Sequence, residues 1–309
     1  MRVAIIGLGV QGRKRIAVAG KDAVATVDPV APDAQYKRLD EVPLDSFDAG
    51  LVCTPDHVKL DVLRYLLSRG KHVLVEKPVL ASRVEELLEL ADMAGSTGAA
   101  LYTAYNHRFE PHIVRLKQVL DAGVLGTLYF GRMFYGNGTA LDIKRSPWRD
   151  QGLGVVADLG SHLLDVVLFL LGRRDPKFEV WTCSHFETKA CDHVVFGSDV
   201  QPVIVLEATV LSWRNTFSLD VFGEHGSAHI QCLCKWGPST FTLRRRVYPS
   251  GRPQEEVQTI ESADLTWALE YDHFKRICRT GGTNIENDIW INSAIGAIAQ
   301  GLREGGFSG

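Results

Sequence analysis

The chain of 309 residues lacks several features that would assign it to a specialised class of protein. Its formal net charge is only −3, so neither nucleic acid nor an anionic membrane surface is an expected electrostatic partner. The opening MRVAIIGLG lacks the basic, apolar and cleavage regions of a signal peptide, and no repeat or low-complexity segment is evident. The most apolar run, 155–172, contains Asp158, His162 and Asp165, which argues against a membrane span.

The six cysteines form no CxxC pair and have no regular spacing. They therefore predict neither a zinc site nor a disulfide framework. Cys232 and Cys234 would point to the same side of a strand, which alone is poor evidence for a metal site. We expect reduced, partly buried thiols in a cytoplasmic protein, and no metal.

The length is sufficient for two domains, and the pattern of strand-like and helical segments differs between the two parts of the chain. Strand-like and helical segments alternate through the first 105 residues, with strands expected at 3–7, 23–28, 49–54, 72–76 and 100–105. This alternation predicts an α/β fold with a parallel sheet covered on both faces. Beyond about residue 120, long strand-like segments dominate, with helices expected at 160–171, 267–278 and 288–302. We expect a second, α+β domain with an antiparallel or mixed sheet, and place the domains at 1–118 and 119–309.

Three glycines near the beginning of the chain have the G-x-G-x-x-G spacing of a dinucleotide-binding turn. The motif follows a predicted strand and opens a predicted helix, as it must. Gly7 would allow the tight turn, Gly9 the close approach of a pyrophosphate, and Gly12 close packing of helix on strand. The helix N-terminus, with Val10 and Gln11, would offer N–H groups to the anion. A tight turn without a ligand is the alternative.

Asp28 ends the second predicted strand, about 20 residues beyond the first glycine. A carboxylate at this place can accept hydrogen bonds from both ribose hydroxyls and would repel a 2′-phosphate. No arginine or lysine follows before Lys37, so we expect NAD rather than NADP. A turn residue before Pro29 is the alternative.

The segment VVADLGSHLLDVVLFLLG places three ionisable groups on a predicted helix. If it is one helix, spacings of four and three residues put Asp158, His162 and Asp165 on the same side. Polar groups in so apolar a helix must be solvated, paired or lining a cavity. Helix capping and an internally bonded histidine are the alternative, but three spaced groups after Gly152 and Gly154 favour a cavity.

In the stretch VLVEKPVL, 73–80, a predicted apolar strand ends at the charged residues Glu76 and Lys77, and Pro78 follows directly. In a doubly wound sheet, ligands bind beyond the carboxyl ends of the strands. The ends of the predicted strands carry Gly7, Asp28, Thr54, Glu76, Lys77 and Tyr105. An ammonium group there can orient or polarise a substrate oxygen, or relay its proton. Glu76 would be a structural partner of Lys77 or a local turn acceptor. A purely solvated Lys77 is the alternative to a functional one.

Seven segments together resemble the Gfo/Idh/MocA family, the glucose-fructose oxidoreductase and inositol dehydrogenase-like enzymes. They run through nearly the whole chain and read GLGVQG, CTPDH, GKHVLVEKP, YNHRFEP, DAGVLGTL, WRDQGLGVVADLGSHLLD and FGEHGSAHI. The EKP tripeptide and the D-x-x-x-H of DLGSH are the specific signals. The resemblance implies an N-terminal Rossmann domain, a C-terminal domain with a large open, mostly antiparallel sheet, and a homodimer or homotetramer through that sheet.

The resemblance also implies roles for individual residues. Lys77 matches the lysine that touches the reacting oxygen and the nicotinamide region. Asp158 and His162 match the catalytic helix, with His162 as the acid or base and Lys77 assisting, or the reverse. The remaining expected cofactor contacts are Thr54, Pro55, His57 and Glu76, and the expected substrate pocket adds Tyr105, Asn106, Arg108, Trp148 and Arg149.

The chain departs from the family pattern in two places. Lys59 stands where the family often has a histidine, while His57 lies nearer the TP proline. The run before the catalytic helix reads QGLG, with fewer glycines than usual. Both departures concern the pocket.

These features predict an NAD-dependent oxidoreductase acting on a secondary alcohol of a sugar, sugar derivative or cyclitol. One alternative is reduction of another carbonyl or of an imine, such as that of a keto sugar nucleotide. Another is a non-catalytic dinucleotide-binding regulator, against which the retention of Lys77, Asp158 and His162 argues.

Overall fold

The computed structural model describes residues 1–146, 149–173 and 177–304, which form two compact units. Met1–Asn106 and Thr266–Asn292 make up the first unit; His107–Leu265 and the described residues from Ser293 on make up the second. These units differ from the predicted ranges 1–118 and 119–309 in two places. Residues 107–118 belong to the second unit, and residues 266–292 pack with the N-terminal sheet. As boundaries of independently folding domains, the predicted ranges remain a prediction.

The first unit contains a six-stranded sheet in which every pairing is parallel. From edge to edge the strands are β2 (Ala23–Val27), β1 (Val3–Ile6), β3 (Ala49–Val52), β4 (His72–Glu76), β5 (Ala100–Ala104) and β14 (Gly282–Thr283). The strand order reverses at β1, which makes the sheet doubly wound. The predicted α/β fold is confirmed for this unit.

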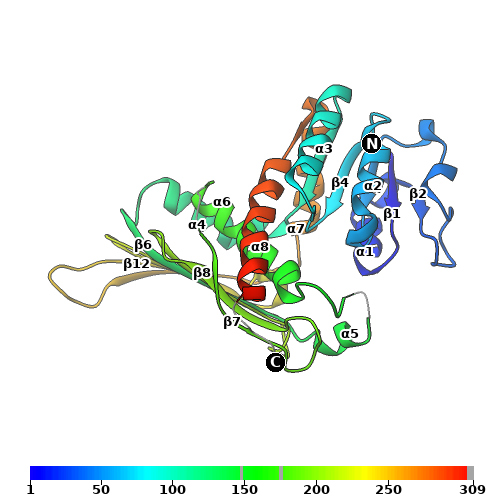
Figure 1. The fold of residues 1–309 in the computed structure, drawn as a ribbon. Helices are drawn as coiled ribbons and strands as arrows, with labels where there is room; N and C mark the ends of the chain where they lie inside the picture. Colours follow the sequence, from blue (N-terminus) through cyan, green and yellow to red (C-terminus); the bar gives the residue numbers. More distant parts are fainter. Residues whose placement is uncertain (147–148, 174–176, 305–309) are drawn as a thin grey trace. The chain divides into compact units, whose positions relative to one another are not determined.

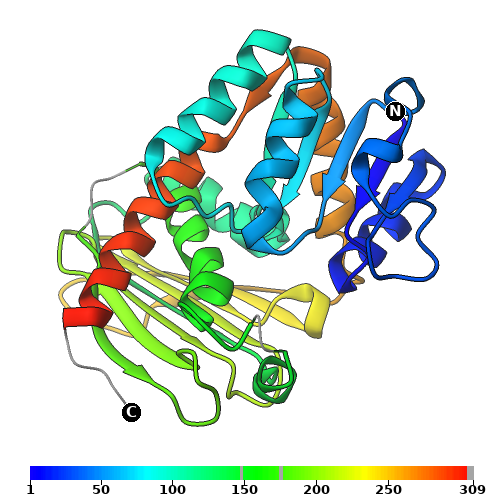
Figure 2. The ribbon, with the colours of Figure 1, turned by 45° about the vertical axis from the view of Figure 1, so that its right-hand side comes forward.

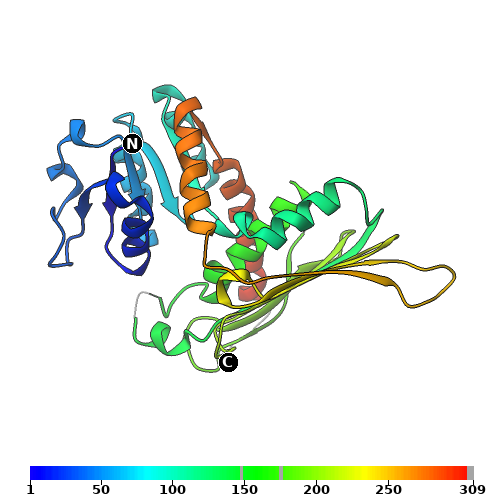
Figure 3. The same ribbon diagram turned by 180° about the vertical axis from the view of Figure 1, so that it is seen from behind.

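Helices cover both faces of this sheet, because successive side chains of a buried strand point to opposite sides. Val3 and Ile5 enter the core that contains Tyr271 and Phe274, on the side of α1 and α7. Ala4 and Ile6 enter the other core, on the side of α2 and α3. Figures 1 and 3 show the two helix layers from opposite sides. The helices are α1 (Val10–Ala19), α2 (Asp56–Leu67), α3 (Val84–Thr97), α7 (Thr266–Thr280) and the first part of α8 (Ile285–Glu304).

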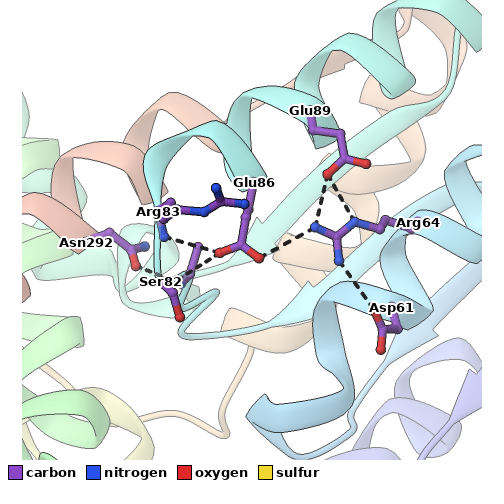
Figure 4. Close-up of polar contacts among 8 residues, drawn as sticks. Asp61, Arg64, Ser82, Arg83, Glu86, Glu89 and Asn292 are labelled. Atoms are coloured by element: carbon purple, nitrogen blue, oxygen red, sulfur yellow. Dashed lines mark hydrogen bonds and ion pairs between the residues drawn. The ribbon is translucent and has the colours of Figure 1, made fainter.

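Polar contacts at the solvent edge join α2 to α3. The Arg64 guanidinium donates to Glu89 at 3.0 Å and lies 3.6 Å from Glu86 (Figure 4). Glu86 also accepts from the backbone N–H groups of Ser82 and Arg83, which caps the start of α3. Solvent-exposed pairs of this kind contribute little to the free energy of unfolding, so burial of the apolar faces supplies most of the stability.

The second unit is built on an eight-stranded, mostly antiparallel sheet, as predicted. The pairing of β6 with β9 is parallel and the others are antiparallel. From edge to edge the strands are β13 (Gln254–Ile260), β12 (Ser239–Arg245), β11 (Gly226–Gln231), β10 (Thr216–Gly223), β6 (Leu128–Gly136), β9 (Val203–Thr209), β8 (His193–Ser198) and β7 (Glu179–Ser184). Figure 2 shows α6 (Ser161–Leu171, green) lying over one face.

Several elements of the second unit differ from the sequence-based expectation. The helix expected at 160–171 is preceded by a π-helical turn, η5 (Val156–Gly160), so the segment is not one regular helix. Strands β8 and β13 and helices α4 (Pro111–Asp121) and α5 (Ala140–Lys144) were not predicted. Among the described residues, every helix is too short or too polar to cross a membrane.

Candidate active site

The glycine turn after β1 contains two glycines that packing requires and one that it does not. Gly7 has φ +92°, and a Cβ on it would lie 2.6 Å from the Cys53 carbonyl oxygen. A Cβ on Gly12 would lie 1.8 Å from the Gly7 oxygen. Gly9, at the start of α1, has φ −66°, and among the described residues a Cβ there would meet no atom within 4 Å. The fold tolerates a side chain at Gly9, so the open space before the helix N-terminus fits the pyrophosphate of a dinucleotide.

Gly9→Ala and Gly12→Ala are therefore expected to fail in different ways. Gly9→Ala should keep its melting temperature but bind NADH about tenfold more weakly or worse, since the methyl group would obstruct charge-assisted backbone hydrogen bonds. Gly12→Ala should lose about 1–3 kcal/mol of stability from the clash with Gly7. Thermal denaturation and NADH titration of both variants test this; weakened folding in Gly9→Ala with unchanged affinity would contradict it.

Asp28, just beyond β2, is fixed by the backbone around the glycine turn. Its Oδ2 accepts from the N–H of Leu8 at 2.7 Å, and its Oδ1 accepts from Val30 and Ala31, both at 2.8 Å. Partial burial acts to raise the pKa of Asp28, but these three hydrogen bonds outweigh it and lower the pKa. Asp28 is thus hydrogen-bonded within the turn, as the alternative to ribose binding expected. The same hydrogen bonds hold its ionised carboxylate beside Gly7, the first glycine of the motif.

The loop after β3 lies against the same turn. The backbone nitrogen of Thr54 would be 3.2 Å from a Cβ on Gly7. The Thr54 hydroxyl oxygen is shielded from solvent and, within the described residues, has no hydrogen-bond partner, which fits a site completed by a ligand. Pro55 precedes α2, and His57 is exposed on its first turn.

Lys77 follows β4, and the residue before it is locked in a buried ionic cluster. Arg15 of α1, 1% exposed, donates to Glu76 and to Glu270 of α7, each at 2.7 Å, and stacks on Trp267. Burial alone would lower the pKa of Arg15, but the two carboxylates raise it. Glu76 is therefore a structural partner of Arg15.

The residues after Lys77 are held as firmly. The buried ammonium of Lys59 donates to the Pro78 carbonyl and to Asp56, both at 2.6 Å. Asn292 of α8 donates to the Val79 carbonyl at 2.7 Å and accepts from the Ala81 N–H at 3.0 Å. The backbone on both sides of Lys77 is thus fixed by polar contacts, while its own side chain is half-buried at a strand end.

His162 lies in a cluster of aromatic rings in the second unit. Its imidazole, 8% exposed, stacks on that of His107 with centroids 4.3 Å apart and planes 21° from parallel. The ring centroid of Tyr135 lies 5.8 Å from that of His162 and 5.6 Å from that of Trp236. Burial raises the pKa of Tyr135, and the charge of Asp158 raises it further. The stack fixes the plane of His162, and sequence reasoning missed both His107 and Tyr135.

The charged residues near His162 form two pairs. Arg108 makes a forked ion pair with the buried Asp165 at 2.6–3.0 Å. Burial raises the pKa of Asp165, and Arg108 opposes that rise. Arg149 lies 3.7 Å from the half-exposed Asp158 in the π-helical turn. Asp165, one of the three spaced groups, is therefore paired, and Arg108 is its counter-ion.

Three further expected pocket residues remain. Tyr105 is buried, and Asn106 donates to the Thr266 hydroxyl at 2.8 Å. Trp148 lies outside the described residues. The structure thus gathers Gly7, Gly9, Asp28 and Thr54 at one edge of the first sheet, and Arg108, Arg149, Asp158 and His162 around α6. In the described part of the chain, no group of three or more His, Cys, Asp or Glu is arranged to hold a metal ion.

Two family models match the chain. Residues 1–105 match the oxidoreductase family with an NAD-binding Rossmann fold, and residues 113–229 match the GFO/IDH/MocA C-terminal domain. Similar curated proteins include the rhizopine catabolism protein MocA of Rhizobium meliloti, 27% identical over 59% of this chain and 60% of that protein. Inositol 2-dehydrogenase of Rhizobium meliloti (strain 1021) is 28% identical over 56% of this chain and 55% of that protein.

The matched part of the chain thus spans less than two thirds of these relatives. A solved structure of an oxidoreductase from Agrobacterium radiobacter in complex with NAD⁺, L-tartaric acid and magnesium aligns with a TM-score of 0.80. That alignment covers 99% of this chain and 97% of the other at 17% identity, so it shows the fold.

Proposed function

Because the chain belongs to the Gfo/Idh/MocA family of oxidoreductases, we propose that it transfers hydride between a nicotinamide cofactor and a secondary alcohol or ketone of a sugar, sugar derivative or cyclitol. The observation that carries the proposal is the glycine turn, in which Gly7 and Gly12 are required by packing while Gly9 is left open. Beside it stand an ionised Asp28 and a strand-end lysine with fixed neighbours.

In the proposed reaction, side chains of the protein accept or return the proton of the substrate hydroxyl. A nicotinamide dinucleotide held by the glycine turn and Asp28 would supply the hydride acceptor for the carbinol carbon. His162 takes the hydroxyl proton, and Lys77 orients the substrate oxygen and stabilises its developing charge. Stacking on His107 keeps the His162 imidazole in one plane, which limits the reorganisation needed for proton transfer. Asp158, with Arg149 nearby, supplies polar contacts to the substrate.

We infer NAD rather than NADP from the charges at Asp28. The two cations whose charges act on Asp28 are engaged elsewhere: Arg13 pairs with Asp33 at 2.9 Å, and Lys37 donates to the Ala31 carbonyl at 2.6 Å. A 2′-phosphate would meet the Asp28 carboxylate, which hydrogen bonds keep ionised.

Asp28→Asn is expected to weaken NADH binding about tenfold, since one charged acceptor for the ribose hydroxyls is lost. NADPH binding should change less or improve, because the repulsion disappears. Calorimetric titration of both cofactors measures this, with Asp92→Asn, an exposed acidic residue on α3, as the control. Equal loss for both cofactors would indicate that Asp28 acts through the turn alone.

The substrate class rests on relatives such as inositol 2-dehydrogenase. Assays of NAD⁺ reduction and NADH oxidation against polyols, sugars and nucleotide sugars test the proposal, and turnover of a cyclitol or sugar is the expected result. Reduction of only a keto sugar nucleotide or an imine would favour the alternative enzyme. NADH binding without turnover of any compound would favour a regulator.

We also propose a homodimer or homotetramer through the eight-stranded sheet, in the cytoplasm. The support is apolar surface on that sheet. Phe130 is 39% exposed and stacks on Phe222 at 4.4 Å, and Trp181 is 44% exposed. Exposed aromatic side chains on a sheet are typical of surfaces that become buried on association.

A further inference from the structure

The ammonium group of Lys59 joins two neighbouring loops at the carboxyl edge of the first sheet. Strands β3 and β4 pair in parallel, so the loops that follow them begin side by side. Lys59 Nζ donates to the Asp56 carboxylate and to the Pro78 carbonyl, both at 2.6 Å. Asp56 begins α2 after the loop of Thr54, and Pro78 directly follows Lys77. One side chain therefore ties the loop expected to border the nicotinamide to the loop of the proposed catalytic lysine.

The burial of Lys59 is not explained by its ion pair alone. Lys59 is 2% exposed, whereas the side chain of Asp56 is 46% exposed. A lysine three residues after an aspartate can form such a pair on the solvated surface of a helix. Removing an ammonium group from water carries a desolvation penalty that commonly matches or exceeds the attraction of its partner. What the buried position adds is the hydrogen bond to the Pro78 carbonyl.

That carbonyl is the one backbone group by which Pro78 can be held. Proline lacks an N–H, so its carbonyl oxygen is its only main-chain hydrogen-bonding group. A hydrogen bond from a charged donor is roughly twice as strong as one between neutral groups. The next carbonyl, that of Val79, is held separately by Asn292 at 2.7 Å. Lys59 thus fixes the residue directly after Lys77.

We propose, on the basis of the proposed function, that Lys59 is a positioning residue for hydride transfer and acts through Pro78 on Lys77. With the Pro78 carbonyl held, the backbone of Lys77 keeps its place relative to the loop after β3. Its ammonium group then meets the substrate oxygen without a search among backbone conformations. The family pattern often has a histidine at this place, so the ammonium contact is particular to chains with a lysine here.

Lys59→Met removes both hydrogen bonds and leaves a flexible apolar side chain in the buried site. With the substrate found in the panel, we expect kcat to fall about tenfold, because a small misplacement of a catalytic group slows the chemical step. The Kd of NADH should stay within about twofold of that of the wild type, since the glycine turn is untouched. An unchanged kcat would overturn the proposal. If Lys59→Met does not fold by circular dichroism, Lys59→Gln, which is also uncharged and shorter, takes its place with the same expected loss.

Lys71→Met is the matched control, because it loses a hydrogen bond of the same kind at the opposite edge of the sheet. Lys71 directly precedes β4, and its Nζ donates to the Phe47 carbonyl at 3.0 Å. Its kcat should stay within about twofold of the wild-type value, since the contact lies at the amino ends of the strands. Equal losses of kcat in Lys59→Met and Lys71→Met would refute a positioning role.

A double-mutant cycle shows whether Lys59 acts through Lys77. In the Lys77→Ala background, Lys59→Met should change kcat by less than about twofold, because the group that it positions is already gone. A purely structural role would instead give a further tenfold loss or so in that background. Such an additive loss would refute the proposed route.

Hydrogen exchange gives a readout that needs no turnover. The amides of residues 76–81 should exchange about tenfold faster in Lys59→Met than in the wild type, and at the wild-type rate in Lys71→Met. Unchanged exchange in Lys59→Met would refute the positioning contact, whatever the activity. Faster exchange in a protein whose wild type turns over no compound would refute the proposed function and still support Lys59 as the residue that holds the Lys77 loop.

Discussion

Turnover of the His162→Ala variant is expected to fall about a hundredfold or more, because the substrate hydroxyl loses its proton acceptor. NADH binding should persist, since the glycine turn and Asp28 are untouched. Lys77→Ala should show the same pattern through loss of the charge beside the substrate oxygen. Steady-state kinetics with the substrate found in the panel, and NADH titration of each variant, measure both effects.

The double variant distinguishes a shared role from two separate ones. If Lys77 and His162 serve the same proton transfer, removing both should cost little more than removing one. Replacing the exposed His225 with alanine provides a control that should keep full activity. Full activity in both single variants would refute the assignment of Lys77 and His162 as catalytic residues. Loss of NADH binding would mean that the substitution acts through the fold.

The second large effect is expected for Arg15→Met, which should lower the free energy of unfolding by about 3–5 kcal/mol. The substitution leaves Glu76 and Glu270 close together, with one counter-ion gone from a site in which Arg15 is 1% exposed. Methionine fills similar space, so the loss reports charge rather than volume. Urea denaturation followed by circular dichroism measures it.

Solution pH separates this explanation from a packing defect. Protonation of a carboxylate relieves an uncompensated buried charge, so the loss in Arg15→Met should shrink as pH falls from 8 towards 5. A cavity would cost the same at every pH. Arg13→Met is the matched control on the same helix, because the ion pair of Arg13 with Asp33 is exposed and should contribute little to the free energy of unfolding.

Much of the first unit could be predicted because its signals are local. Strands β1 to β5 and helices α1 to α3 follow from apolar runs, helical spacing and glycines within a few residues of each element. The polar strand β13, QEEVQTI, gave no such signal, since its side chains are almost all exposed and pairing with β12 defines it. The two-residue β14 likewise exists only through its pairing with β5.

The candidate site shows the same division. The glycine motif, Asp28, Lys77 and His162 could be named from spacing and resemblance, but their partners could not. Glu76 and Arg15 are 61 residues apart, and Arg15 and Glu270 are 255 residues apart. No periodicity reports pairings of that separation, because tertiary packing alone brings them together. The stacking of His162 on His107 was missed for the same reason.

Strand β14 and helix α7 belong to the first unit although they come late in the chain, which has a consequence for folding during translation. When the ribosome has released only the first hundred or so residues, β5 still has a bare edge and Arg15 still lacks Glu270. Those groups emerge only after the whole eight-stranded sheet. Translation of the first unit therefore begins before that of the second unit, yet the first unit can be completed only after it.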